Sequence, residues 1–303
     1  MIRKTNLFFI ILAIVTLFVS FYRLADFYHL DFDQERDYQV ISDLVYHHKL
    51  TLIGPRAVSS AGFFLGPWYY YLLTPFFIIF NGQPLYAAFV TGLINLITTL
   101  VLFYFLKKHT NQLTALSISL LWLSVLNRTA WNVMFIPLFT IGILFFLLRP
   151  KQTTVSLLSL VFLTSLGIHF HFQVVLFIPL IFFYSFFIKP KFPPLKSKLI
   201  IFLFIAFLLP LLPLIVFDLR HNFLNLNAFY HFFADKLQGS TNFSYLILLR
   251  FSLRDLIREI GQFTPWSLTL DYLTLPFVYL SILVYFFKTK QQSFFILSLF
   301  PTI

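Results

Sequence analysis

The sequence predicts an all-α fold, a multi-pass transmembrane helical bundle, and three observations support this prediction. Hydrophobic residues make up 59% of the 303 residues and charged residues only 11%, against about 25% charged residues in a soluble domain. The apolar residues form long runs separated by short polar breaks, and acidic and basic residues are sorted into different breaks. No soluble core could bury this much apolar surface, so the bilayer is expected to be its solvent.

Each long apolar run is expected to be a spanning helix, although several are shorter than the ~20 residues of an average span. The expected helices cover about residues 5–25, 84–106, 112–127, 132–148, 153–169, 173–188, 198–217, 267–287 and 292–303. The first run follows a basic start and lacks a small-residue cleavage site, so it is expected to stay uncleaved. If successive loops alternate between the two sides of the membrane, residues 67–80 cannot cross it. They are expected to dip into the membrane or lie on it, with Pro67 and Pro75 breaking this segment.

The distribution of charge predicts the topology. The eleven acidic residues lie only in two segments, from Asp26 to Asp43 and from Asp218 to Asp271. Basic clusters without acidic neighbours lie at residues 3–4, 107–108, 149–151, 189–198 and 288–290, and such clusters mark cytoplasmic loops. We therefore expect a cell-membrane protein with a cytoplasmic N-terminus and extracytoplasmic outer loops at 26–66 and 218–266. Interfacial helices are expected in the first of these loops and around 223–262.

The remaining composition narrows the possible classes of protein. The net charge of +11 is explained by the basic loops, so we expect no nucleic-acid partner. Absence of cysteine excludes structural disulfides and thiolate metal sites. We expect one transmembrane domain over residues 1–303, and because the chain ends within an apolar run, a C-terminal truncation.

An acidic cluster directly after the first expected helix is the sharpest candidate site. If a helix starts at Asp33, this residue is its N-cap, Asp33 and Asp37 share one face, and Arg36 lies one turn from Asp33. Closely spaced carboxylates near a low-dielectric surface raise one another's pKa, which suits a general base. They could also bind a divalent cation through oxygen ligands, or Asp33, Glu35 and Asp37 could simply form a solvated helix start.

Four further polar segments are expected on the same outer face. Residues 62–71 combine glycine, proline and aromatic residues, and residues 68–71 are interpreted as an aromatic belt at the lipid–water boundary. The other three segments contain side chains that could bind phosphate, and each has a structural alternative such as interfacial snorkelling. These candidates are Arg128 and Asn132 in one break, His169 and His171 with Gln173 in the next, and Arg220 and His221 after Asp218.

The order of these segments resembles that of the polytopic C-type glycosyltransferases (GT-C). The resemblance is to the superfamily of protein O-mannosyltransferase-like and aminoarabinose-transferase-like enzymes (glycosyltransferase family 39-like, RgtA/B/C/D-like domain). The matching stretches are "DFDQERDYQVISDLVYHHKLTLIGP", "GFFLGPWYYYLLTPFF", "LNRTAWN", "GIHFHFQ" and "FDLRHNF". One departure is that Phe64-Leu65-Gly66-Pro67 stands where relatives carry a charged Glu-Lys-Pro-Pro-like element.

The resemblance implies an inverting transfer of a hexose or pentose from a polyprenyl-phosphate carrier to an extracytoplasmic lipid, glycan or protein acceptor. It implies that an acid in the first outer loop acts as the base or orients the acceptor, and by position this acid is Asp33, with Asp37 and Glu35 in reserve. The carrier phosphate would be faced by Arg36, Arg128, His171 and Arg220, and membrane lipids would surround the site. No cofactor is expected to be required, and a divalent cation is an option.

Two other classes of protein stay open at this point. A transporter or lipid flippase would place ionisable residues near the bilayer midplane, whereas the expected helices are nearly free of charge. A non-catalytic membrane scaffold is the second alternative. Motifs that cradle nucleotide phosphates are absent from the sequence, so direct use of a nucleotide is unsupported.

Overall fold

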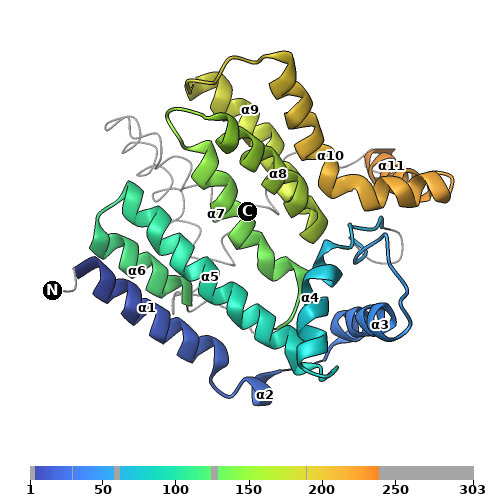
Figure 1. The fold of residues 1–303 in the computed structure, drawn as a ribbon, viewed down its shortest axis with the longest axis horizontal. Coiled ribbons are helices and arrows are strands. Elements are labelled where there is room, and N and C mark those ends of the chain that lie inside the picture. The colour runs from blue at the N-terminus through green and yellow to red at the C-terminus, as the bar shows by residue number, and fades with distance from the viewer. Residues whose placement is uncertain (1–3, 29, 58–61, 124–128, 189, 239–303) are drawn as a thin grey trace. The chain divides into compact units, whose positions relative to one another are not determined.

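The structure is a computed structural model that describes residues 4–28, 30–57, 62–123, 129–188 and 190–238 (Figure 1). The chain divides into two units, residues 1–232 and residues 233–303, and the helices of the candidate site belong to the first. The described part consists of helices, turns and two isolated β-bridges, without strands. Its first helices are α1 (Lys4–Phe21), α2 (Leu24–Phe27), α3 (Phe32–Tyr46), α4 (Trp68–Ile79), α5 (Leu85–His109) and α6 (Gln112–Leu123). The 3₁₀ turn η1 (Asn132–Phe135) leads into α7 (Ile136–Leu147), followed by α8 (Thr154–Phe170), η2 (Phe172–Leu176), α9 (Phe177–Ile188), α10 (Ser197–Arg220) and α11 (Leu224–Gln238).

The helical prediction is confirmed for every expected run that the structure describes. The expected spans between 84 and 217 correspond to α5, α6, α7, α8, α9 and α10 within a few residues. The expected spans at 267–287 and 292–303, and most of the interfacial region around 223–262, lie outside the described residues.

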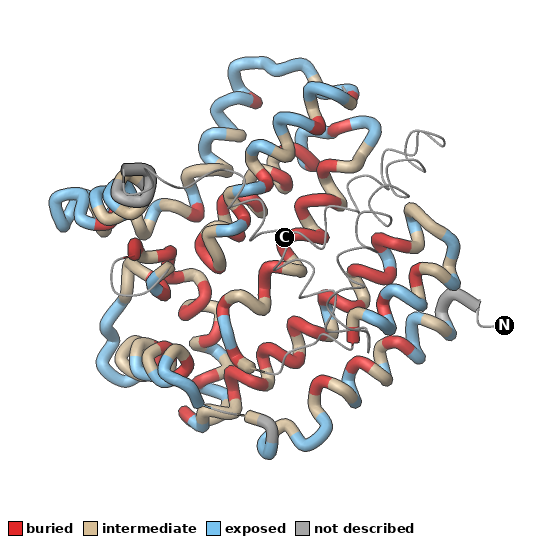
Figure 2. Tube along the Cα trace, turned by 180° about the vertical axis from the view of Figure 1, so that it is seen from behind, coloured by how far each residue is buried: buried red, intermediate tan, exposed pale blue. Residues whose placement is uncertain are grey.

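Two of the described helices are long and apolar enough to cross a membrane, namely α5 and α10. Most of α5 is buried by its neighbours, so its apolar character alone does not separate a membrane helix from a core helix. In contrast, α10 exposes large apolar side chains, such as Ile201, Phe202 and Phe204, over most of its surface. Figure 2 shows this difference as red along α5 and pale blue along much of α10. Such an apolar surface weakly indicates association with a membrane.

Helix α4 lies in the hydrophobic core and is not broken where the sequence predicted. Pro67 is its N-cap, but Pro75 lies inside the helix and does not interrupt it. Tyr69 and Tyr70 are each only 2% exposed and pack with Ile41 of α3 in the core. The prediction that these two tyrosines belong to an aromatic belt at the lipid–water boundary is therefore wrong, because protein surrounds them.

The acidic first turns of α3 and the basic α7–α8 turn lie near opposite ends of α8. Its first turn follows the basic segment 149–153, and its last turn meets the segment that carries Asn132. Seventeen residues at 1.5 Å each separate these ends by about 25 Å. In Figure 1, α3 and α4 lie at the lower right, whereas the turns between α7 and α8 and between α9 and α10 lie at the top.

Candidate active site

The acidic cluster forms the first turns of α3, whose start differs from the predicted one. The helix begins at Phe32 with Asp31 as its N-cap, not Asp33. The side chain of Gln34 explains the shift, because its Oε1 accepts a hydrogen bond from the Asp31 backbone N–H at 3.0 Å, as in a capping box. With this start, Gln34 and Asp37 face inward, and Glu35 is exposed on the other side.

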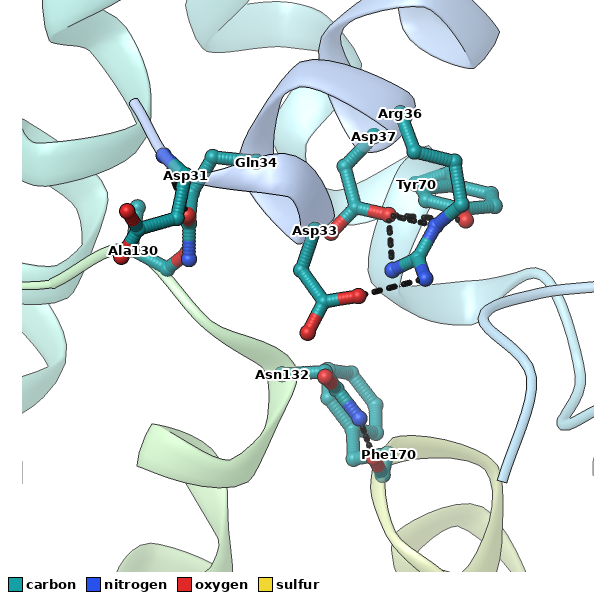
Figure 3. A network of polar contacts seen from close by, with 9 residues as sticks. All are labelled: Asp31, Asp33, Gln34, Arg36, Asp37, Tyr70, Ala130, Asn132 and Phe170. Atoms are coloured by element: carbon teal, nitrogen blue, oxygen red, sulfur yellow. Dashed lines mark hydrogen bonds and ion pairs between the residues drawn. The ribbon is translucent and has the colours of Figure 1, made fainter. Parts of the chain in front are cut away.

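Arg36 bridges the two aspartates, as Figure 3 shows. Its Nη1 donates to Asp33 Oδ1 at 2.7 Å, while Nε and Nη2 donate to Asp37 Oδ1 at 3.0 and 2.7 Å. The hydroxyl of Tyr70 on α4 donates to the same Asp37 oxygen at 2.9 Å. The predicted grouping of Asp33, Arg36 and Asp37 on one face is therefore confirmed, and Tyr70 extends the network into the core.

The two aspartates differ in environment. Asp37 is 3% exposed, and its Oδ2 is buried without a hydrogen-bond partner in the described part of the chain. Burial raises the pKa of the Asp37 carboxyl above its ordinary value, although the Arg36 guanidinium and the Tyr70 hydroxyl oppose this effect. The side chain of Asp33 is 40% exposed and uses only Oδ1 in the ion pair. Asp33 is thus the more accessible carboxylate, and Asp37 is held inside.

Two hydrogen bonds bring the next two polar segments to α3. Gln34 Nε2 donates to the Ala130 carbonyl at 3.0 Å, and Asn132 Nδ2 donates to the Phe170 carbonyl at the end of α8. In Figure 3, the second oxygen of Asp33 points away from Arg36 and toward the segment that carries Asn132. The acidic cluster, the Asn132 segment and the histidine turn therefore lie together.

His169 packs against the glycine-rich part of the first loop. The ring is 1% exposed, and neither ring nitrogen has a hydrogen-bond partner among the residues that the structure describes. A Cβ added to Gly66 would lie 1.6 Å from His169 Nδ1, and one added to Gly54 would lie 2.0 Å from the Gly66 carbonyl oxygen. Glycine is required at both positions because backbone and ring approach so closely. In this conformation His169 is shielded from any ligand.

His171 is the more accessible of the two histidines. It is half-buried between α8 and η2, and its Nδ1 accepts a hydrogen bond from the Gln173 N–H at 3.3 Å. Burial lowers the pKa of His171 below its ordinary value. The ring is therefore neutral near pH 7 and can offer Nε2–H as a hydrogen-bond donor, rather than a full positive charge.

The last predicted segment forms the turn between α10 and α11. Asp218 Oδ1 accepts hydrogen bonds from the backbone N–H groups of Asn225 and Leu226 at 2.8 and 3.3 Å. His221 Nδ1 donates to the Phe217 carbonyl at 2.8 Å. These contacts give Asp218 and His221 structural roles in the turn. Arg220 is exposed at the end of α10, and a role in phosphate binding stays a prediction for Arg220 and His221.

Asn225 joins this turn to the first loop. Its side chain accepts from the Phe64 N–H at 2.6 Å and donates to the Phe64 carbonyl at 3.1 Å. A second contact joins α4 to α10, because Trp68 Nε1 donates to the Pro210 carbonyl at 2.7 Å. The five polar segments predicted from the sequence are thus linked by side-chain contacts into one region, with Arg128 itself outside the described residues.

A divalent cation at the aspartate pair would meet a competing charge. Arg36 already lies between Asp33 and Asp37 and uses one oxygen of each. In the described ranges, no group of three or more His, Cys, Asp or Glu side chains could hold a metal ion. The optional cation stays a prediction.

The side chains of three residues connect the segments of the site, and this role was not predicted for them from the sequence. The spacing Asp31-x-x-Gln34 is a capping-box pattern and could have identified Gln34. Tyr70 and Asn225 carry no comparable signal, because their partners lie 33 and 161 residues away along the chain. Such contacts depend on tertiary packing.

Comparisons with known proteins add no assignment. No family model matches this chain, and no curated protein or solved structure matches it either. A proposal about function therefore depends on the residues and geometry of the site.

Proposed function

We propose that this chain is a multi-pass membrane glycosyltransferase of the C type, which transfers a sugar from a polyprenyl-phosphate carrier to an extracytoplasmic acceptor with inversion. The observation that carries the proposal is the Asp33–Arg36–Asp37 network beside Asn132 and the end of α8. A carboxylate held in one orientation at the end of a helical bundle suits a reaction between a lipid-borne donor and a polar acceptor.

The membrane placement is supported by the helices and by the positions of the charges. Helix α10 exposes apolar side chains, and about 25 Å of α8 separate the acidic network from the basic turns, close to the ~30 Å thickness of the hydrocarbon core. With the basic turns in the cytoplasm, the N-terminus is also cytoplasmic and the acidic network is extracytoplasmic. The expected first outer loop then contains α3, next to the carrier's head-group level.

Asp33 is the proposed base. Its free oxygen accepts the proton of an acceptor hydroxyl, whose oxygen attacks the anomeric carbon while the bond from that carbon to the phosphate oxygen breaks. Arg36 positions Asp33 by holding its other oxygen, and Asp37 with Tyr70 positions Arg36. This assignment moves Arg36 away from the carrier phosphate, because both aspartates already engage its guanidinium. Glu35 has no part in the step, since it faces the other side of α3.

The leaving group is a polyprenyl phosphate, which needs stabilisation by hydrogen bonds and cations rather than by a redox cofactor. His171 is proposed as a hydrogen-bond donor to this phosphate, and Arg128 and Arg220 as its cationic partners. Asn132 holds the end of α8 near α3 through the Phe170 carbonyl.

The test uses the purified full chain in proteoliposomes with a panel of polyprenyl-phosphate hexoses and pentoses. Release of polyprenyl phosphate is measured, because this product does not depend on which acceptor is used. Asp33→Asn should lower the rate by about 10²–10⁴-fold, the usual contribution of a general base. Glu35→Gln is the matched control on the same helical turn and should leave the rate unchanged.

Two results would contradict the proposal. Full activity of Asp33→Asn would remove this residue from the mechanism. Appearance of the sugar inside the vesicles while it stays attached to its lipid carrier would favour a flippase.

A further inference from the structure

The basic ends of the helices, opposite the aspartate network, form a joined structure rather than separate loops. Lys151 and Lys191 pair in an isolated parallel β-bridge between the α7–α8 turn and the segment before α10. Gln152 N–H donates to the Lys191 carbonyl at 2.9 Å, and Lys191 N–H donates to the Pro150 carbonyl at 3.2 Å. Two cationic segments that lie 40 residues apart along the chain are therefore fixed side by side.

Gln152 makes the α7–α8 turn rigid. Its buried Nε2 shares its two hydrogens among the carbonyls of Phe146 and Leu147, the last two residues of α7, and of Arg149 just after the helix. Its Oε1 accepts from Ser156 Oγ on α8. The carbonyls left free at the end of a helix are thereby satisfied by one side chain. A turn held in this way presents its cations without a large entropy cost on binding.

Arg149 and Lys108 share one aromatic ring. The Arg149 guanidinium lies 5.0 Å from the Phe145 ring centroid, and Lys108 Nζ lies 5.2 Å from the same centroid. Arg149 also contacts the Phe146 ring at 5.0 Å. Its Nε is buried and has no hydrogen-bond acceptor in the part of the chain that is described. Two like charges are thus held near one another, and one of them keeps an unused donor.

Among the described residues, the helix ends and turns that meet here contain no carboxylate to neutralise these cations. Residues 44–217, which include the C-terminal ends of α5, α7 and α9 and the N-terminal ends of α8 and α10, contain no Asp or Glu. Repulsion between cations at a low-dielectric boundary is relieved when an anion binds between them. An arginine can bind a phosphate through two parallel hydrogen bonds, and aromatic rings beside it fit the start of an acyl chain.

We propose that this end binds the headgroup of an anionic phospholipid, with Arg149 as the phosphate contact and Lys108 beside it. Lys151 and Lys191 on the joined turns attract the anionic leaflet surface. Basic side chains near such a surface strengthen the attraction to it. The proposal rests on the membrane placement proposed above but not on sugar transfer.

The test measures thermal unfolding of the purified full chain in a neutral detergent, without any sugar donor. Dioctanoyl phosphatidylglycerol should raise the unfolding midpoint in a saturable manner, and dioctanoyl phosphatidylcholine should not. Arg149→Gln should raise the half-saturating lipid concentration about tenfold, which corresponds to the loss of one charge-assisted hydrogen bond. Lys49→Gln, which neutralises an exposed lysine near the end of α3, should leave that concentration unchanged.

Lys108→Gln is the second variant, since Lys108 is exposed and its replacement leaves the packing of the helix in place. It should raise the half-saturating concentration several-fold. An equal effect of phosphatidylcholine, an equal effect of inorganic phosphate, or an unchanged response in both the Arg149 and Lys108 variants would overturn the proposal. Asp33→Asn should bind phosphatidylglycerol like the wild type, which separates this proposal from the proposed sugar transfer.

Discussion

The contact between Gly66 and His169 provides the most direct test of the arrangement on which the candidate site depends. In Gly66→Ala, the new Cβ would lie 1.6 Å from His169 Nδ1, 2.5 Å from Cε1 and 2.7 Å from Cγ. Ordinary contacts of a Cβ lie at 3.4–4 Å, so the ring would have to move by roughly 2 Å. His169 is 1% exposed and surrounded by packed side chains, so it has little space to move into.

Overpacking of this kind costs about 1–3 kcal/mol. At roughly 2–4 °C per kcal/mol for a unit of this size, the thermal unfolding midpoint of Gly66→Ala should fall by about 2–12 °C. His169→Ala should also destabilise the protein, because it leaves a cavity. In the double variant, however, the alanine methyl at 66 enters the vacated space. The cost of the double variant should therefore be about 1–3 kcal/mol smaller than the sum of the single costs.

Gly142→Ala serves as the matched control. This glycine lies inside α7, and its added Cβ would meet only a terminal methyl of Leu163 at 3.2 Å. Because that methyl can move and alanine favours a helix, the midpoint should stay the same or rise slightly. The contact would be refuted if Gly66→Ala were as stable as the wild type. It would also be refuted if Gly66→Ala destabilised the His169→Ala protein as much as it destabilises the wild type. The first loop and the end of α8 would then not converge.

Three further predictions concern α3 and the first loop. Burial raises the Asp37 pKa, so the stabilisation from its protonation is present below the ordinary value of 3.8 and lost as pH rises through the folded-state value. Asp37→Asn should therefore gain stability relative to the wild type as pH rises from about 4, and thermal midpoints that differ by a constant amount would argue against the raised pKa. Asp43 gives the opposite sign, because Lys49 and His47 lower its pKa, so its stabilisation is lost as pH falls below 3.8. Asn225→Ala removes both hydrogen bonds to the Phe64 backbone and should cost about 1–3 kcal/mol. Unchanged protease cleavage of the first loop in Asn225→Ala would show that this tether does not hold the loop.

The sequence alone determined the positions of the helices, because an apolar run and its polar boundaries are local features. The run at 84–106 became α5, and the run at 198–217 became α10. The same holds for the aspartate pair, since Asp33, Arg36 and Asp37 are near neighbours on any α-helix. Even the misplaced N-cap has a local explanation, because the Asp31–Gln34 spacing is itself a capping-box pattern.

Tertiary structure alone decided which polar side chains find a partner and which are buried. Tyr70 stands in a run of three tyrosines, and its hydroxyl can donate to Asp37 only because α4 packs against α3. The hydroxyl of the next residue, Tyr71, donates to the Thr51 carbonyl instead. His169 and His171 look alike in the sequence, yet one ring is sealed against Gly66 and the other is accessible. The physical reason is that a hydrogen bond or a close contact depends on atoms brought together from distant parts of the chain, whereas helix formation depends on neighbours within one or two turns.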